Sequence, residues 1–240
     1  MLNNIHIVLV NTTHPGNIGA AARALKTMGL SHLSLVQPKF FPDPEATARA
    51  STAVDILESA QVYPSLDAAI ADCSIIIGAS ARRRSVEVPI LTPRETAEWI
   101  QQNYQHQRVA LLFGRERDGL TNEEMDRCQR LVTIPANPEY SSLNIASAVQ
   151  VLCYELRVAS LNTQLVQEVE EEPRATAKEL ADLYQHLEET LLDIKFLNPK
   201  GPSQVFRKLQ RMFQRNNLSS LEVRMLRGIL KHMQESVEDN

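Results

Sequence analysis

Short apolar runs alternate with helical patterns over residues 1–162, and this alternation constrains the fold more than any other feature. The apolar runs are rich in Ile, Val and Leu and predict strands over Ile5–Val10, Leu33–Val36, Ser74–Gly78, Val109–Phe113 and Leu131–Ile134. The patterns between them predict helices over Ile18–Met28, Glu45–Ala60, Asp67–Asp72, Pro93–Asn103, Asn122–Cys128 and Leu143–Leu161. Alternating strands and helices are typical of a parallel sheet buried on both faces, so the sequence predicts an α/β domain.

The character of the chain changes after Leu161. An acidic, unpatterned stretch, QEVEEE followed by a proline, predicts a linker over residues 163–175. Beyond it the apolar residues recur at helical spacing, and Thr176 followed by Glu179 reads as a capping box. We therefore expect a second, all-helical domain over residues 176–240.

Composition excludes several classes of protein. The chain has 25 basic and 29 acidic residues, 22% charged and 43% hydrophobic residues, which is typical of an ordinary globular protein. Its three cysteines form no CxxC pair and its six histidines are scattered singly, so neither a disulfide framework nor a metal site is expected. No apolar stretch reaches the length of a membrane span and the N-terminus lacks a signal-peptide pattern, so we expect a cytoplasmic protein.

Basic residues concentrate in the helical part of the chain. Between Lys195 and Lys231 there are nine basic residues against Glu222 alone. A solvated helix face would explain this, and so would a patch that follows the phosphates of a nucleic acid. The sequence leaves both interpretations open.

Three segments at predicted strand ends carry the residues of a candidate site. The first, residues 15–23, is a glycine-containing turn that opens a helix, but it has neither the GxGxxG pattern of a dinucleotide site nor the GKS/GKT pair of a P-loop. Its Arg23 has two interpretations, a surface salt bridge and a functional cation. The second segment, residues 111–121, ends a buried strand in a loop with two glycines and four charges. Either a ligand site or a tight turn with two positive-φ residues would account for that loop.

The third segment, residues 134–144, follows the last predicted strand and precedes a long helix. Ser141, Ser142 and Asn144 are all suited to cap that helix, which leaves Tyr140 unexplained. A weaker feature lies after the third strand, where Ala79, Ser80 and Ala81 precede three arginines. Those arginines belong either to a solvated loop or to the same sheet edge as the other segments.

Together, these segments resemble the three signature motifs of the SPOUT class of RNA methyltransferases, in the branch that methylates ribose 2′-hydroxyls. The matching patterns are N-x-x-x-x-x-R in NIGAAAR, F-G-x-E-x-x-G-L in FGRERDGL, and I-P followed by S-L-N. They occur in order over residues 1–160. Within this class, the segment NPEYSSLN and the helical extension are most similar to bacterial tRNA methyltransferases that act on the ribose of nucleotide 32 in the anticodon loop.

The resemblance implies a domain whose C-terminal part forms a trefoil knot, S-adenosylmethionine as the methyl donor, and a homodimer that completes each active site across its interface. It implies catalytic roles for Arg23, Asn17, Glu116 and Ser142. It implies cofactor contacts from Ala79, Ser80, Ala81, Gly114, Ile134, Ser141, Ser142, Leu143 and Asn144. Substrate contacts are expected from Tyr140, Arg82, Arg83 and Arg84.

The chemistry of these groups narrows the expected mechanism. A guanidinium group stays protonated at neutral pH, so we expect Arg23 to orient the target phosphate and stabilise the developing alkoxide rather than accept a proton. Another tRNA nucleotide, a ribosomal RNA target and a non-catalytic RNA-binding factor on the same fold remain alternatives. The sequence does not fix which nucleobase or which tRNAs are accepted.

Overall fold

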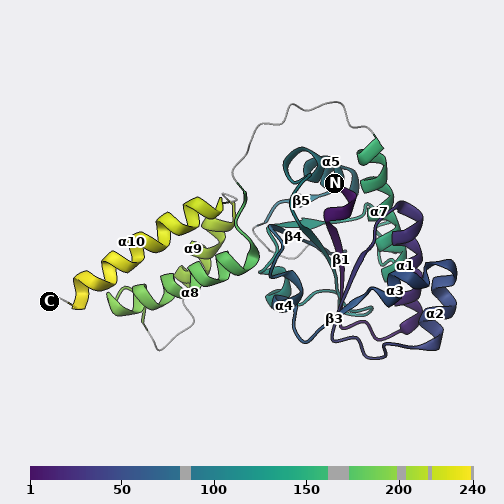
Figure 1. The fold of residues 1–240 in the computed structure, drawn as a ribbon, viewed down its shortest axis with the longest axis horizontal. Coiled ribbons are helices and arrows are strands. Elements are labelled where there is room, and N and C mark those ends of the chain that lie inside the picture. Colours follow the sequence, from purple (N-terminus) through teal and green to yellow (C-terminus); the bar gives the residue numbers. More distant parts are fainter. Residues whose placement is uncertain (82–87, 162–172, 199–203, 216–217, 239–240) are drawn as a thin grey trace. The chain divides into compact units, whose positions relative to one another are not determined.

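The computed structural model describes residues 1–81, 88–161, 173–198, 204–215 and 218–238. The chain divides into two compact units, residues 1–167 and 168–240, and each is described separately (Figure 1). The arginines at positions 82–84 and most of the expected linker lie outside the described residues. Within the described helices, none is both long enough and apolar enough to cross a membrane.

A parallel sheet forms the centre of the first unit. Its strands, in chain order, are β1 (Ile5–Val10), β2 (His32–Val36), β3 (Gln61–Tyr63), β4 (Ile75–Ala79), β5 (Ile90–Leu91), β6 (Val109–Phe113) and β7 (Arg130–Val132). The described strands form a seven-stranded sheet in the order β3-β2-β1-β6-β4-β7-β5. Every pair is parallel, so the α/β class expected from the sequence is confirmed.

Helices cover both faces of this sheet (Figure 1). They are α1 (Pro15–Met28), α2 (Pro44–Ala50), α3 (Val54–Glu58), α4 (Leu66–Ile70), α5 (Pro93–Asn103), α6 (Asn122–Met125) and α7 (Ile145–Leu161), with 3-10 turns η1 (Leu2–Asn4) and η2 (Ser51–Ala53). On β4, Ile75 and Ile77 join a core cluster with α1, α5 and α7. Gly78, which points to the other face, lies against Leu120 and Cys128. The alternation of side chains along β4 thus buries both faces of the sheet.

The structure corrects the sequence prediction at three elements. The two edge strands β3 and β5 were not expected, because they are three and two residues long and carry exposed side chains such as Val62 and Ile90. The single helix expected over Glu45–Ala60 is divided into α2, η2 and α3. Ser51, at the break, has a φ of 54°, which lies outside the helical region and so interrupts the helix.

The strand order places the last strands between earlier ones. β6 lies between β1 and β4, and β7 lies between β4 and β5, although the chain visits β4 and β5 first. The ends of β4, β6 and β7 therefore meet at the carboxyl edge of the sheet, where α/β proteins bind ligands. The trefoil knot implied by the resemblance stays a prediction.

The second unit is helical in its described part. It contains α8 (Ala177–Asp193), α9 (Gln204–Arg215) and α10 (Ser220–Glu238), whose apolar side chains share one buried cluster. Thr176 caps α8 through its expected partner Glu179, with the hydroxyl and the carboxylate each accepting a backbone N–H. Of the expected linker, residues 173–175 are described, and Ala175 is buried in this cluster, so the ordered unit begins before the capping residue.

Candidate active site

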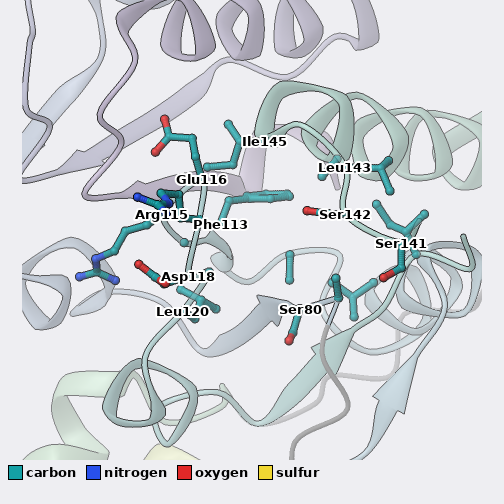
Figure 2. A pocket seen from close by; sticks show the side chains of 18 residues that line it. Ser80, Phe113, Arg115, Glu116, Asp118, Leu120, Ser141, Ser142, Leu143 and Ile145 are labelled. Atoms are coloured by element: carbon teal, nitrogen blue, oxygen red, sulfur yellow. The ribbon is translucent and has the colours of Figure 1, made fainter. Parts of the chain in front are cut away.

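A pocket of about 240 Å³ opens at the carboxyl ends of β4, β6 and β7 (Figure 2). Its walls come from the loops that follow these strands and from the start of α7. The lining residues are Ala79, Ser80, Ala81, Phe113, Gly114, Arg115, Glu116, Arg117, Asp118, Gly119, Leu120, Val132, Ile134, Ser141, Ser142, Leu143, Ile145 and Ala148. The second and third segments singled out in the sequence, together with residues 79–81, thus converge on one pocket, whereas no residue of the first segment lines it.

The loop after β6 depends on two glycines for different reasons. Arg115 and Gly119 exchange backbone hydrogen bonds, which closes the loop into a tight reversal. Gly119 has a φ of 68°, a conformation that favours glycine. At Gly114 the requirement is space, because a Cβ there would lie 2.1 Å from the carbonyl carbon of Gly119 and 2.2 Å from the nitrogen of Leu120. The tight-turn interpretation was thus half right, since one positive φ and one close approach shape this loop.

Glu116 reaches from this loop to the N-terminus of α1. Its carboxylate accepts hydrogen bonds from the backbone N–H groups of Thr13 and His14, at 3.2 Å each, from the Thr13 hydroxyl at 3.0 Å, and from the Asn17 amide at 2.9 Å. Partial burial raises the pKa of this carboxyl, but the hydrogen bonds from Asn17 and the backbone outweigh burial and hold the pKa below its usual value. Glu116 is therefore ionised at neutral pH, and its negative charge lies at the N-terminus of α1, whose N-cap side chain makes no capping hydrogen bond.

Asn17 connects the carboxylate of Glu116 to the third segment. While its amide nitrogen donates to Glu116, its amide oxygen accepts a hydrogen bond of 2.9 Å from Asn144. Asn144 in turn accepts the backbone N–H groups of Ala146 and Ser147 and so caps α7. One chain of hydrogen bonds therefore joins a residue from each of the three sequence segments and fixes their relative positions.

Arg115 adds a second tie that the sequence did not predict. Its guanidinium group forms an ion pair with Glu124 at 3.0 Å and donates to the Asn11 side chain at 2.6 Å. Glu124 was expected only as the acidic partner of the Thr121 capping box, a role that it also has. Arg115 and Glu124 lie close together in the sequence and carry opposite charges, and this was the only sequence signal that could have indicated their ion pair.

The structure places the expected site residues in three groups. Nine line the pocket: Ala79, Ser80, Ala81, Gly114, Glu116, Ile134, Ser141, Ser142 and Leu143. Asn17 and Asn144 do not line it but are joined to its wall by hydrogen bonds, Asn17 to Glu116 and Asn144 to Asn17. Arg82, Arg83 and Arg84 lie outside the described residues. The sequence reasoning missed Phe113, Asp118, Leu120 and Val132, which line the pocket and directly adjoin the recognised residues.

Arg23 and Tyr140 form the third group, which does not line the pocket. Arg23 lies on α1 six residues after Asn17 and is exposed, and within the described ranges no carboxylate pairs with it. This disfavours the surface salt bridge that the sequence left open. Tyr140 is 81% exposed. Both side chains are thus accessible to a large ligand or to another protein chain.

Among the described residues, no group of three or more His, Cys, Asp and Glu side chains could hold a metal ion. The three cysteines are free and buried. Burial raises the pKa of the Cys73 and Cys153 thiols to about 12, so these groups are unreactive at neutral pH.

Comparison with known proteins identifies both parts of the chain. Residues 4–154 match the model of the SpoU rRNA Methylase family, and residues 178–240 match the model described as tRNA methyltransferase TrmJ, C-terminal domain. A relative from Pseudomonas aeruginosa, named tRNA (cytidine/uridine/adenosine-2'-O-)-methyltransferase TrmJ, is 49% identical over 98% of this chain and 95% of its own. A relative from Pectobacterium atrosepticum, named tRNA (cytidine/uridine-2'-O-)-methyltransferase TrmJ, is 48% identical over 100% of both chains.

A solved structure extends this similarity to three dimensions. The crystal structure of TrmJ from Z. mobilis ZM4 has a TM-score of 0.84 and 35% identity, and the match covers 95% of this chain and 98% of that chain. The similarity thus includes the α/β unit, the helical unit and the segments that build the pocket. The chain belongs to the SpoU methylase family.

Proposed function

We propose that the protein transfers a methyl group from S-adenosylmethionine to the 2′-hydroxyl of a tRNA ribose, that of nucleotide 32 in the anticodon loop. The hydrogen-bond chain from Glu116 through Asn17 to Asn144 is the observation that carries this proposal. It unites the three segments that resemble the ribose methyltransferase motifs around one pocket. The full-length similarity to relatives named as tRNA 2'-O-methyltransferases supports tRNA as the substrate.

The pocket suits a nucleoside-sized cofactor. Its volume of about 240 Å³ lies just below the usual range of small-molecule sites, which begins at about 300 Å³. Small residues such as Ala79, Ser80 and Gly114 leave room close to the backbone, and apolar side chains such as Leu120 and Ile134 provide surfaces for an aromatic base. The charged lining residues are balanced, with Glu116 and Asp118 against Arg115 and Arg117, so a carboxylate is available to a cationic sulfonium.

The residues of this chain prepare the transfer by positioning and charge. When bound, the cofactor would supply an electrophilic methyl group for in-line displacement by the ribose oxygen, with the sulfonium leaving as a neutral thioether and the hydroxyl proton passing to water or a neighbouring carboxylate. Glu116, held ionised by its hydrogen bonds, fixes the orientation of Asn17 at the N-terminus of α1. We propose that Arg23 binds the target phosphate and stabilises the developing alkoxide, because both are negatively charged and its guanidinium group is positively charged. We propose that Ser142 contacts the target ribose and that Tyr140 contacts the target base.

A homodimer completes this proposal. α7 carries a stripe of partly or fully exposed apolar side chains at helical spacing, Val151, Tyr154, Val158 and Leu161. Tyr154 is 51% and Leu161 is 68% exposed, and the stripe begins beside the pocket lining. A second copy of the chain that covers this stripe would bring its own exposed Arg23 and Tyr140 near the pocket. Light scattering tests this: the Tyr154→Arg variant should be monomeric and inactive, and a monomeric wild-type protein would contradict the dimer.

The helical unit is proposed to grip tRNA. Arg207, Lys208 and Arg211 on α9 and Arg224 and Arg227 on α10 supply positive charge that can follow phosphates. A chain truncated after residue 164 should keep its affinity for S-adenosylmethionine while its affinity for tRNA and the salt dependence of binding both decrease. An unchanged salt dependence would show that the helical unit does not bind tRNA.

The direct test of the function is a map of 2′-O-methylation in tRNA from cells that lack the protein. We expect the modification to disappear at nucleotide 32 and to return when the wild-type protein is restored. Loss of the modification at another tRNA nucleotide or in ribosomal RNA would show that the proposed target nucleotide is wrong. An unchanged map would show that the protein is not the enzyme that makes this modification. The same map, sorted by nucleobase, decides whether adenosine is accepted beside cytidine and uridine. Because tRNA is the substrate, we place the protein in the cytoplasm.

A further inference from the structure

Helices α1 and α2 approach each other at a glycine of the first motif. A Cβ on Gly19 would lie 2.0 Å from the carbonyl oxygen of Ala46 and 2.9 Å from the Cβ of Arg49. The backbones of the two helices are therefore in direct contact at this point, which any side chain would prevent. The contact also places the side chain of Arg49 beside the face of α1 that contains Gly19.

Arg23 lies on this same face of α1. Residues 16, 19, 23 and 26 share one side of the helix, because steps of three and four residues return to the same face. Gly19 marks one end of the contact, and at the other end Lys26 binds the carbonyl oxygen of Thr52 and the carboxylate of Asp55, at 2.8 and 2.7 Å. Arg23 lies between these two contacts along α1, one helical turn from Gly19, and both Arg23 and Arg49 are exposed beside the contact of the two helices.

Positive charges outnumber the carboxylates on this face. Glu45 lies against Gly16, but it pairs with His14, at 3.7 Å, and with neither arginine. Lys26 has a carboxylate partner in Asp55. Arg23 and Arg49 are both exposed, and within the described ranges neither has an acidic partner. Two adjacent guanidinium groups repel each other unless an anion lies between them. Their planar, forked donors match the oxygens of a phosphate.

We propose that Arg49 and Arg23 form a two-guanidinium site for one backbone phosphate of the RNA substrate. This inference rests on the proposed function and adds Arg49 as a positioning residue. Gly19 then has a role in the site, because its missing side chain lets α2 bring the second guanidinium group to the first. Arg49 acts on substrate placement and not on the cofactor, whose pocket is lined by other residues.

The test compares Arg49→Gln with a matched control in the full-length chain. Arg108→Gln removes an exposed arginine at the opposite, amino edge of the sheet. For Arg49→Gln we expect the KM for tRNA to rise about tenfold, kcat to stay within about twofold, and the slope of log affinity against log salt to decrease by about one. Arg49→Lys should restore the salt slope but only part of the KM, because lysine keeps the charge without the fork. Arg108→Gln should behave as wild type.

A structural role for Arg49 gives a different result. Arg49 is the basic residue in the last turn of α2, where a cation stabilises a helix. If that is its only role, Arg49→Gln lowers the melting temperature and leaves KM and the salt slope unchanged, which overturns the proposal. The double variant with Arg23→Gln should weaken tRNA binding by less than the product of the single effects, since both groups hold one phosphate. Full additivity would place the two arginines on separate phosphates. Failure of the proposed function itself is distinguishable, because wild-type protein would then transfer no methyl group to tRNA.

Discussion

The two edges of the central sheet use polar residues in opposite ways. At the amino edge the polar groups satisfy one another: the rings of His6 and His32 stack at 4.6 Å, and Arg108 pairs with Asp72 at 3.2 Å. At the carboxyl edge, hydrogen bonds join the loops, yet Tyr140 is exposed, and so is Arg23 on the helix α1 that begins at this edge. Backbone strain also occurs at the carboxyl edge.

Asn11 and Gln37, which follow β1 and β2, have positive φ values of 51° and 46° although neither is glycine. Strained residues persist where the surrounding structure holds them, and they concentrate at functional sites. One edge of the sheet thus contributes to the stability of the fold, while the other carries the groups that are available to ligands. Substitutions at the two edges should therefore separate binding from stability.

The largest effect is expected from Gly114→Ala at the carboxyl edge. The new Cβ would overlap the backbone of Gly119 and Leu120, so the loop must move and the pocket wall with it. We expect cofactor affinity, measured by calorimetry, to fall at least about 100-fold, with a stability loss of about 2–4 kcal/mol. Gly228→Ala is the matched control, because nothing lies within 4 Å of its Cβ in α10, and it should stabilise the protein by about 0.5–1 kcal/mol. Wild-type affinity in Gly114→Ala would show that this wall does not hold the cofactor.

The next effect is expected from Arg23→Lys, on the exposed side of the same edge. Lysine keeps the charge but not the planar fork, so we expect methyl transfer to fall about 1,000-fold while S-adenosylmethionine binds as before. The optimum of the pH–rate profile should not move, since neither side chain titrates in catalysis. Retained turnover with a displaced pH profile would instead identify residue 23 as the proton acceptor.

The sequence predicted the centre of this architecture well. The bounds of β1 and β6 agree with the apolar runs Ile5–Val10 and Val109–Phe113, because fully buried strands must be continuously apolar. The helix starts at Thr92 and Thr121 were predictable from capping boxes, a local signal. The edge strand β3 was not predictable, since three residues at a sheet edge need no apolar pattern.

The site was predictable in its loops but not in its contacts. The rule that ligands bind at the carboxyl ends of parallel strands pointed to the correct loops. The partners Asn17 and Glu116 are 99 residues apart, and Asn17 and Asn144 are 127 apart. Only the folded sheet, with β6 next to β1, brings such distant groups within hydrogen-bond reach.

A smaller effect at the carboxyl edge is expected when this hydrogen-bond chain is cut. Asn17→Ala and Asn144→Ala should each lower kcat about 10- to 100-fold, because each removes the hydrogen bond that joins the N-terminus of α1 to the start of α7. The double variant should lose less than the sum of the single effects, with a coupling energy of about 1 kcal/mol. Asn103→Ala, which removes an amide from the exposed end of α5, is the control and should keep wild-type kcat. Additive effects would show that the two asparagines work independently.

The smallest effect is expected at the amino edge and concerns stability alone. Burial, with the nearby charges of His32 and Arg108, lowers the pKa of His6 from 6.5 to about 4. Between these values the unfolded chain binds a proton that the native state does not, so the stability contributed by neutral His6 is complete above pH 6.5 and is lost as the pH falls toward 4. Partial exposure screens the ring, and we expect the loss to be about 1 kcal/mol.

Urea unfolding of the α/β unit at neutral and acidic pH measures this difference. His6→Gln should flatten the pH dependence relative to wild type, whereas His106→Gln, a change at an exposed histidine, should leave it unchanged. Cofactor affinity at neutral pH should be the same in all three proteins, because His6 lies at the edge that takes no part in binding. A weaker cofactor affinity in His6→Gln would contradict the separation of stability and binding between the two edges. A change at the amino edge would then affect the pocket at the carboxyl edge, and β1 is the strand that connects the two.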